Sequence, residues 1–488
     1  MEENKNKNLN SQIKSGFVWN FLERGGIQII TFVVQLVLAR LLTPEDYGII
    51  AILSVFISLS STFVNNGLGN AVIQKKDSDE KDFNTVFIFQ LFTALFFVAV
   101  LFIASPWIAQ YYNNDKLVVY LRVMSLTLII DALYAMHFVR LKVQLQFKKR
   151  FYANIVGIIA QSVVGIGMAL MGCGVWSLIV SQIAQKVAIL LTLLLLVRWI
   201  PKLQFSFKRL KKLFSYSWKL FVGWLIGTLH HDIYAMVIGK FFTMETLGYY
   251  NRASNLPQTI TKTVNETVSN VMFPALAKLQ DNTEAFKQHT RKMMSLISFI
   301  IWPVVAGIAA VSESFIMVIL TEKWAKSIEM MQLFAVSYGF NIVSTANMQS
   351  FNALGRSDIF MKLEMVKRTL SVLLLILAAV FIGNIYIVIG IIVLMGLFSV
   401  VYNSFVNVRL LNYCIKEQLS DMLPPVLLSV IMFVLVSLVN LLSIPYILKL
   451  VIQVVLGVII YFLLATIFKL PAMNSVKDII KSLIKKGR

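Results

Sequence analysis

The segments RLLTPEDYGII at residues 40–50 and KFFTMETLGYY at residues 240–250 decide the fold, because they show that the chain repeats itself at an offset of 200 residues. Four positions match in charge or identity: Arg40 with Lys240, Thr43 with Thr243, Glu45 with Glu245, and Gly48 with Gly248. The same register continues through Val64-Asn65 with Val264-Asn265, and through Asn70 with Asn270. These matches predict two copies of one helix–loop–helix unit.

The composition around this repeat indicates a membrane protein. Of 488 residues, 58% are hydrophobic and 14% are charged, whereas about 25% are charged in an ordinary soluble protein. A soluble enzyme, a secreted disulfide scaffold and a disordered chain are excluded. The net charge of +21 is not gathered in a separate basic domain, so we do not expect nucleic-acid binding. Cys173 and Cys414 form no metal-ligand pattern, and we expect no metal site.

Fourteen apolar stretches are long enough to cross a bilayer, since a spanning helix takes about 20 apolar residues. They lie at about 16–41, 46–70, 84–110, 118–141, 151–172, 175–200, 216–241, 246–276, 288–311, 328–353, 360–382, 385–411, 421–443 and 446–468. Lys and Arg gather in alternate loops, as in residues 140–150 and 198–219. Because cytoplasmic loops carry the excess of Lys and Arg, both termini are predicted to be cytoplasmic.

An even number of spans per repeat gives the two copies the same orientation in the membrane, which is a transporter architecture. We therefore predict an all-α polytopic membrane protein with fourteen transmembrane helices, two parallel-repeat six-helix lobes of MATE/MOP-like type and two C-terminal helices. The predicted domains are an N-lobe at 1–200, an amphipathic cytoplasmic linker at 201–215, a C-lobe at 216–412, and spans 13 and 14 with a basic tail at 413–488. Spans 13 and 14 carry few polar residues, so we expect them to face lipid instead of lining a cavity.

Two basic segments have apolar residues at helical spacing and are predicted to lie on the anionic cytoplasmic leaflet. In the linker these are Leu203, Phe207, Leu210 and Phe214; in the tail they are Val476, Ile480, Leu483 and Ile484. For the tail, a solvated basic connector is an equally good interpretation.

Polar residues form stripes within the repeat-matched spans, although a charge at mid-membrane costs roughly 2.5–3.5 kcal/mol. The stripes hold Asn20, Glu23, Arg24 and Gln28 in span 1, Asn65 in span 2, His231 and Asp232 in span 7, and Arg252, Asn255, Lys262 and Glu266 in span 8; Asp131 lies in span 4. One interpretation is that they face a water-filled cavity between the two lobes. The alternative is that they pair with one another and hold helices together.

A cavity lined by arginine, amides and hydroxyls suits an amphiphile with a phosphate and a glycan head, because arginine binds phosphate through its planar fork. We predict that the substrate is bound by Asn20, Arg24, Gln28, Asn65, Arg252, Asn255 and Lys262. Coupling to H⁺ or Na⁺ would use Glu23, Asp131, His231, Asp232 and Glu266. No cofactor is expected.

Five segments carry a resemblance to a known family. They are LARLLTPEDYGIIAI (38–52), FVNNGLGNAVIQ (63–74), LGYYNRASNLPQ (247–258), VSNVMFPALAKLQ (268–280) and NALGRSDIF (352–360). In this order they resemble the polysaccharide-transporter branch of the multidrug/oligosaccharidyl-lipid/polysaccharide (MOP) exporter superfamily, most closely the Wzx-type O-antigen and colanic-acid flippases. In related lipid II flippases, arginines of the first and eighth helices line the cavity, which is the role the resemblance implies for Arg24 and Arg252. Span 2 departs from that pattern because it has no basic residue in its middle.

The resemblance implies a flippase that moves undecaprenyl-pyrophosphate-linked oligosaccharide from the inner to the outer leaflet of the bacterial inner membrane, for lipopolysaccharide or exopolysaccharide synthesis. It would work by alternating access in the lipid bilayer, with possible contacts to polysaccharide assembly proteins. A cation-coupled multidrug antiporter of the same superfamily is one alternative. A membrane polysaccharide polymerase is another, but Asp77-Ser78-Asp79 sits in a short loop without a nucleotide-binding domain, so we expect no enzyme activity.

Overall fold

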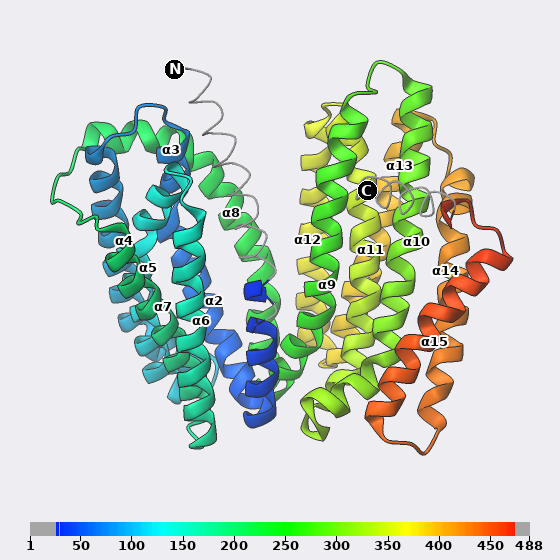
Figure 1. Cartoon of the computed structure of the whole chain (residues 1–488), viewed down its shortest axis with the longest axis horizontal. Coiled ribbons are helices and arrows are strands. Elements are labelled where there is room, and N and C mark those ends of the chain that lie inside the picture. Colours follow the sequence, from blue (N-terminus) through cyan, green and yellow to red (C-terminus); the bar gives the residue numbers. More distant parts are fainter. Residues whose placement is uncertain (1–25, 29, 474–488) are drawn as a thin grey trace. The chain divides into compact units, whose positions relative to one another are not determined.

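The computed structural model describes residues 26–28 and 30–473, and every regular element in them is a helix (Figure 1). The chain divides into two compact units, Met1–Gly248 (unit 1) and Tyr249–Arg488 (unit 2). The predicted site residues Asn20, Glu23 and Arg24 and the tail residues 476–484 lie outside the described residues.

Unit 1 is a bundle of long helices joined by short connections. After a helix that ends at Leu41, it contains α2 (Pro44–Asn65), α3 (Leu68–Gln74), α4 (Glu80–Tyr111), α5 (Lys116–Val143), α6 (Phe147–Leu170), α7 (Val175–Val197) and α8 (Phe207–Phe241). The unit boundary falls just inside the next helix, α9 (Met244–Ala277).

Unit 2 continues α9 and is also helical in its described part. It contains α10 (Thr283–Phe315), the short turns η1 (Ile316–Leu320) and η2 (Glu322–Trp324), α11 (Ser327–Ala353), α12 (Ser357–Phe381), α13 (Ile385–Leu411), α14 (Ile415–Ser437), η3 (Leu438–Leu441) and α15 (Tyr446–Ile467). Its largest core includes Phe286 and Met294 of α10, Ile342 of α11 and Tyr413, all buried.

Ten helical segments of the described chain are long and apolar enough to cross a membrane. The chain is therefore a multi-pass membrane protein, as predicted. Helices α9, α11 and α12 have 34, 27 and 25 residues, which is enough to span about 30 Å of hydrocarbon at 1.5 Å per residue, but they are more polar than the ten. The count of fourteen spans stays a prediction.

The sequence repeat corresponds to a repeated helix start. Thr43 caps α2 by accepting a hydrogen bond from the Asp46 amide at 3.2 Å, and Thr243 accepts one from the Thr246 amide at 3.1 Å. Side-chain oxygens at this position satisfy amides that the first helical turn leaves unpaired. The repeat therefore encodes the local backbone as well as the order of helices.

The two repeated glycines contact each other's helix start. A Cβ atom on Gly48 would lie 1.7 Å from the carbonyl oxygen of Met244, and a Cβ atom on Gly248 would lie 1.8 Å from the carbonyl oxygen of Pro44. Both distances are far inside van der Waals contact, so a side chain at either position requires the backbones to separate. The contact is reciprocal, because each glycine lies against the first residue of the other helix.

The predicted span at 46–70 is interrupted in the structure. Helix α2 ends at Asn65, because Asn66 (φ 35°) and Gly67 (φ 75°) adopt left-handed backbone conformations before α3 begins. Glycine and asparagine tolerate this conformation better than other residues. The repeat-matched residues of α9 are Glu266 and Thr267, and there the helix continues for another ten residues to Ala277.

The predicted amphipathic linker is not a separate helix. Residues 201–206 are non-helical, and the rest of the segment forms the first turns of the continuous helix α8. These turns lie across one end of unit 1, and α8 then turns to run along the bundle (Figure 1). Leu210 and Leu213 are buried against residues of α3, α4 and α5. Helix α8 therefore packs within unit 1, although we predicted it as the first helix of the C-lobe.

Candidate functional site

Helix α9 exposes a stripe of polar side chains along one face. Asn255, Lys262 and Glu266 are exposed on this face, at the three- and four-residue spacing that places side chains on one side of a helix. Neither Lys262 nor Glu266 takes part in an ion pair within the described part of the chain. The stripe therefore presents one ammonium and one carboxylate to the surroundings of the helix.

Threonine hydroxyls on α9 bond to their own helix. Thr259 donates to the carbonyl oxygen of Asn255 at 2.8 Å, and Thr267 donates to that of Thr263 at 2.9 Å. The amide of Asn255 donates to the side-chain oxygen of Asn251 at 2.9 Å. This back-bonding uses the hydroxyl protons, so the hydroxyl oxygens remain as acceptors. A sugar hydroxyl, which both donates and accepts, can pair with such a mixture of acceptors and amides.

Arg252 lies one turn before Asn255 but is buried, with 9% of its surface exposed. Its guanidinium is thus not part of the exposed stripe, although the sequence places it at the same helical spacing. Of the three cationic residues predicted to bind substrate, Lys262 is exposed, Arg252 is buried, and Arg24 lies outside the described residues. Lys262 is therefore the cation on which a site on α9 depends.

Polar residues of α2 and α8 bond to one another within unit 1, although His231 itself is exposed. The Asp232 carboxylate accepts a hydrogen bond from the Ser58 hydroxyl and contacts His231 Nδ1 at 2.8 Å. One turn further along α2, the hydroxyls of Thr62 and Thr228 lie 3.3 Å apart. Asp232 is buried. This arrangement fits the alternative of interhelical pairing, because the side chains of one helix bond to those of the other.

The remaining described candidates are distributed over unit 1. Asp131 of α5 forms a 2.5 Å ion pair with Lys186 of α7 and accepts a 2.6 Å hydrogen bond from Tyr134. Gln28 and Asn65 are exposed, and the Asn65 amide donates to the Ser61 hydroxyl at 3.1 Å. The structure therefore pairs Asp232 with its neighbour His231, and Asp131 with Lys186.

A buried polar ladder between α11 and α13 was not predicted from the sequence. The Asn403 amide donates to the Ser344 hydroxyl at 2.8 Å, and the Asn407 amide donates to the Asn347 side-chain oxygen at 2.8 Å. The Ser344 hydroxyl also lies 2.6 Å from that of Ser399. The spacing of four between positions 399, 403 and 407 was the available signal. Its role in the structure is to join two helices of unit 2.

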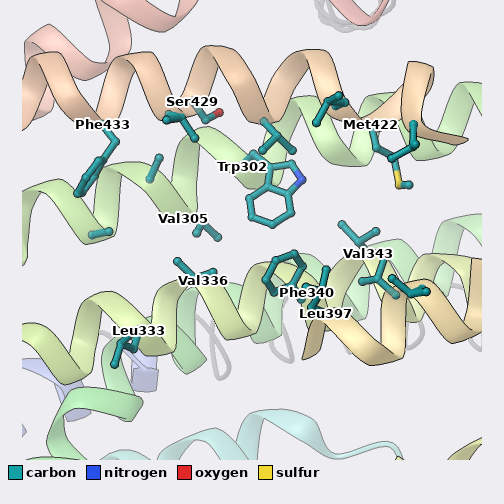
Figure 2. Close-up of a pocket in the computed structure, with 18 of the residues that line it drawn as sticks. Trp302, Val305, Leu333, Val336, Phe340, Val343, Leu397, Met422, Ser429 and Phe433 are labelled. Atoms are coloured by element: carbon teal, nitrogen blue, oxygen red, sulfur yellow. The ribbon is translucent and has the colours of Figure 1, made fainter. Parts of the chain in front are cut away.

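Unit 2 also contains an apolar groove of about 1010 Å³ between α10, α11, α13 and α14. Figure 2 shows Trp302 and Phe340 among its lining residues, with their rings packed edge to face at a centroid distance of 5.2 Å, and Met422 and Phe433 of α14 along one wall. The lining residues on α14 run from Ile415 to Phe433, which corresponds to about 27 Å of helix. This corrects our expectation for span 13: α14 lines a groove instead of only facing lipid.

Within residues 26–28 and 30–473, no group of three or more His, Cys, Asp or Glu side chains is arranged to hold a metal ion. Cys173 and Cys414 are free thiols.

Comparison with known proteins assigns this fold and sequence to a family. The family described as "Polysaccharide biosynthesis protein" matches residues 37–329, which is more than half of the chain. The chain is 24% identical to the lipopolysaccharide biosynthesis protein WzxC of Escherichia coli K12 over 409 residues, covering 82% of each chain. It is 24% identical to the teichuronic acid biosynthesis protein TuaB of Bacillus subtilis over 357 residues, covering 72% of this chain and 73% of TuaB.

Two solved structures share the fold. The lipid II flippase MurJ in an inward closed conformation matches with a TM-score of 0.69 at 18% identity, covering 91% of this chain and 98% of MurJ. An inward-facing multidrug resistance MATE family transporter of the MOP superfamily matches with a TM-score of 0.59 at 13% identity, covering 80% of this chain and 96% of the transporter. These likenesses confirm the predicted MATE/MOP-like architecture, and the family match shows that the chain is a member of the polysaccharide biosynthesis protein family.

Proposed function

We propose that this protein is a flippase that moves a lipid-linked oligosaccharide from the inner to the outer leaflet of the bacterial cytoplasmic membrane for surface polysaccharide synthesis. The observation that carries the proposal is the exposed polar stripe on α9 in a multi-pass member of the polysaccharide biosynthesis family. Relatives named for lipopolysaccharide and teichuronic acid biosynthesis support the class of substrate. The shared fold of the lipid II flippase MurJ favours a transporter over an enzyme.

In this proposal the α9 stripe binds the polar head of the substrate. The Lys262 ammonium pairs with a pyrophosphate oxygen, because Lys262 is exposed and forms no ion pair with any residue that the structure describes, and charge-assisted hydrogen bonds to phosphate are strong. The amide of Asn255 and the hydroxyl oxygens of Thr259 and Thr263 contact sugar hydroxyls. Arg24, Asn20 and Gln28, on the first predicted span, would contribute further polar contacts.

The groove of unit 2 suits the lipid part of the substrate. It is lined mainly by aliphatic and aromatic side chains, such as Val305, Val336 and Leu397 (Figure 2). Its extent of about 27 Å along α14 approaches the hydrocarbon thickness of about 30 Å. An apolar chain in this groove would remain in an environment like that of the bilayer while the polar head moves.

Coupling to H⁺ or Na⁺ would involve Glu266. Asp131 is paired with Lys186, and Asp232 is held by Ser58 and His231, whereas Glu266 is exposed one turn after Lys262. A carboxylate four residues from a lysine on one helix face interacts with it. Binding of a cation by Glu266 would neutralise this nearby carboxylate and so favour the pairing of Lys262 with the pyrophosphate. A Glu266→Gln variant would then transport substrate without dependence on the coupling ion.

The experiment compares strains that lack the protein and are rescued with wild-type, Lys262→Gln or Arg252→Ala protein. The lipid-linked oligosaccharide is extracted and the membrane face that holds it is determined. The matched control is Lys278→Gln, because Lys278 is exposed directly after α9. We expect rescue by wild type and the control, and about 10–100-fold less outward transfer for Lys262→Gln at equal expression, as for loss of a hydrogen bond to a charged group.

Two outcomes oppose the proposal. If oligosaccharide reaches the outer leaflet normally without the protein, the flippase function is wrong for that glycan. If Lys262→Gln rescues as well as Lys278→Gln, the α9 stripe is not the site. The antiporter alternative predicts instead that the protein expels cationic dyes and that its loss leaves the oligosaccharide distribution unchanged.

A further inference from the structure

The connector before α8 and the first turns of that helix form a strongly basic surface, which we call the basic belt (residues 200–219). It contains the six basic residues Lys202, Lys208, Arg209, Lys211, Lys212 and Lys219 and no acidic residue. The belt belongs to unit 1 and plays no part in the α9 stripe or the groove. Its role therefore needs a separate explanation.

One side of the belt is fixed to the protein. Leu210 and Leu213 are buried with residues of α3, α4 and α5, and Arg209 pairs with Asp79 and with Asp82. Partial burial raises the pKa of Asp79, but its hydrogen bonds from Arg209 and Asp82 outweigh this and lower the pKa below its ordinary value. The Arg209 contact thus stays ionised at neutral pH, and the belt has a defined orientation.

The other side of the belt is exposed and basic. Lys208, Lys211, Lys212 and Lys219 are all exposed, and none of them forms an ion pair within the described part of the chain. At 100° per residue, these lysines lie opposite Leu210 and Leu213 on the helix. Four ammonium groups close together repel one another, so an anionic partner would stabilise this arrangement.

Exposed apolar side chains accompany the lysines. Phe207 is 70% exposed, Trp218 is 45% exposed, and Leu203 in the connector is 93% exposed. Aromatic rings next to lysines are typical of surfaces that lie in the headgroup region of a bilayer. An acidic protein in the cytoplasm would pair with the lysines but would leave these apolar groups without a partner.

The length of α8 places the belt at the membrane surface. Its 35 residues correspond to about 52 Å of helix, more than the hydrocarbon core of about 30 Å requires, and its first turns lie across the end of unit 1 instead of along the bundle (Figure 1). The first turns must therefore lie outside the hydrocarbon. The excess of positive charge assigns them to the cytoplasmic side, where anionic lipids give the leaflet its negative surface potential.

We infer that the basic belt binds anionic phospholipid headgroups of the cytoplasmic leaflet, with the lysines contacting phosphates and with Phe207 and Trp218 entering the headgroup region. The binding anchors the start of α8 from the membrane side, as Leu210 and Leu213 anchor it from the protein side. This inference does not depend on the proposed substrate.

The test uses full-length protein in nanodiscs with Cys173 and Cys414 replaced by serine and a fluorophore attached at Ser215→Cys, which is exposed among the lysines. Quenching by brominated phosphatidylglycerol is compared with quenching by brominated phosphatidylcholine at equal mole fraction. We expect a preference of about tenfold for the anionic lipid, because several lysines near a leaflet each contribute attraction. High salt should reduce this preference.

A matched pair of variants isolates the belt. Lys208→Gln, Lys211→Gln, Lys212→Gln and Lys219→Gln together should abolish the preference. Replacing Lys278, Lys292, Lys362 and Lys416 by Gln removes the same charge at exposed positions and should preserve it. The inference is overturned if wild-type protein shows no preference, if the belt variant keeps it, or if both variants lose it equally. It is also overturned if the lysines bind an acidic cytoplasmic protein while the lipid preference is absent. Lipid preference is read without transport, so the proposed flippase function can fail independently.

Discussion

Helices α2 and α9 are repeat-matched, begin alike and carry polar stripes, yet their polar side chains have different environments. On α2, Ser58 and Thr62 contact α8 through Asp232 and Thr228. On α9, Asn255, Lys262 and Glu266 remain exposed. The difference teaches that a polar stripe in a membrane helix can serve packing in one copy of a repeat and remain exposed in the other.

The largest expected effect concerns the feature that the two helices share. Gly48→Ala or Gly248→Ala should each lower the free energy of unfolding by about 3 kcal/mol, since a Cβ atom would overlap a carbonyl oxygen of the opposite helix start and overpacking costs about 1–3 kcal/mol. Thermal unfolding in detergent measures this. Gly167→Ala is the control, because a Cβ atom there meets nothing within 4 Å. Normal stability of both variants would show that the helix starts do not meet at these glycines.

A smaller effect is expected where the two helices diverge. Gly67→Ala should destabilise the protein by about 1–2 kcal/mol, because Gly67 has a φ of 75° and the left-handed conformation costs other residues about this much. The repeat-matched Thr267→Ala lies within continuous helix α9 and should leave stability unchanged. Chemical denaturation of both variants in the same detergent checks the contrast; equal effects would mean that α2 is not interrupted at this point.

The smallest effect separates a packed carboxylate from an exposed one. Asp232→Ala should cost about 1 kcal/mol of stability, because it leaves Ser58 without its interhelical partner and such bonds average somewhat below this value in membrane proteins. Glu266→Ala, on the exposed face of α9, should have no effect on stability. The melting temperatures of the two variants test this difference. A greater loss of stability for Glu266→Ala than for Asp232→Ala would show that Glu266, and not Asp232, is the packed carboxylate.

Much of the fold followed from the sequence because its signals are local or repeated. Apolar stretches predicted the long helices, and the repeat at an offset of 200 residues predicted that α2 and α9 correspond. The start of α8 could not be placed, because Leu210 fits equally well on a lipid-facing or a protein-facing side. Leu213 is buried in the same cluster as Leu210. That burial depends on the packing of the neighbouring helices, which the spacing of apolar residues does not reveal.

The candidate site was harder to predict for a related reason. The spacing of polar residues is the same whether the partner is water, substrate or another helix. Lys186 therefore could not be recognised as the partner of Asp131, and Arg252 could not be recognised as buried. The apolar groove was missed because α14 has an ordinary span composition, and only its packing beside α10, α11 and α13 creates the space.

The central claim is that the exposed stripe of α9 holds the polar head of a lipid-linked oligosaccharide. The most direct test places a photoreactive benzoylphenylalanine at Asn255 or Thr259, both on the polar stripe, and at Val271, which is 57% exposed and lies on the other side of α9 at 100° per residue. Membranes containing glycan-labelled substrate are then irradiated. Our account predicts labelled adducts at 255 and 259 and none above background at 271. Equal labelling at all three positions, or labelling at 271 alone, would contradict it.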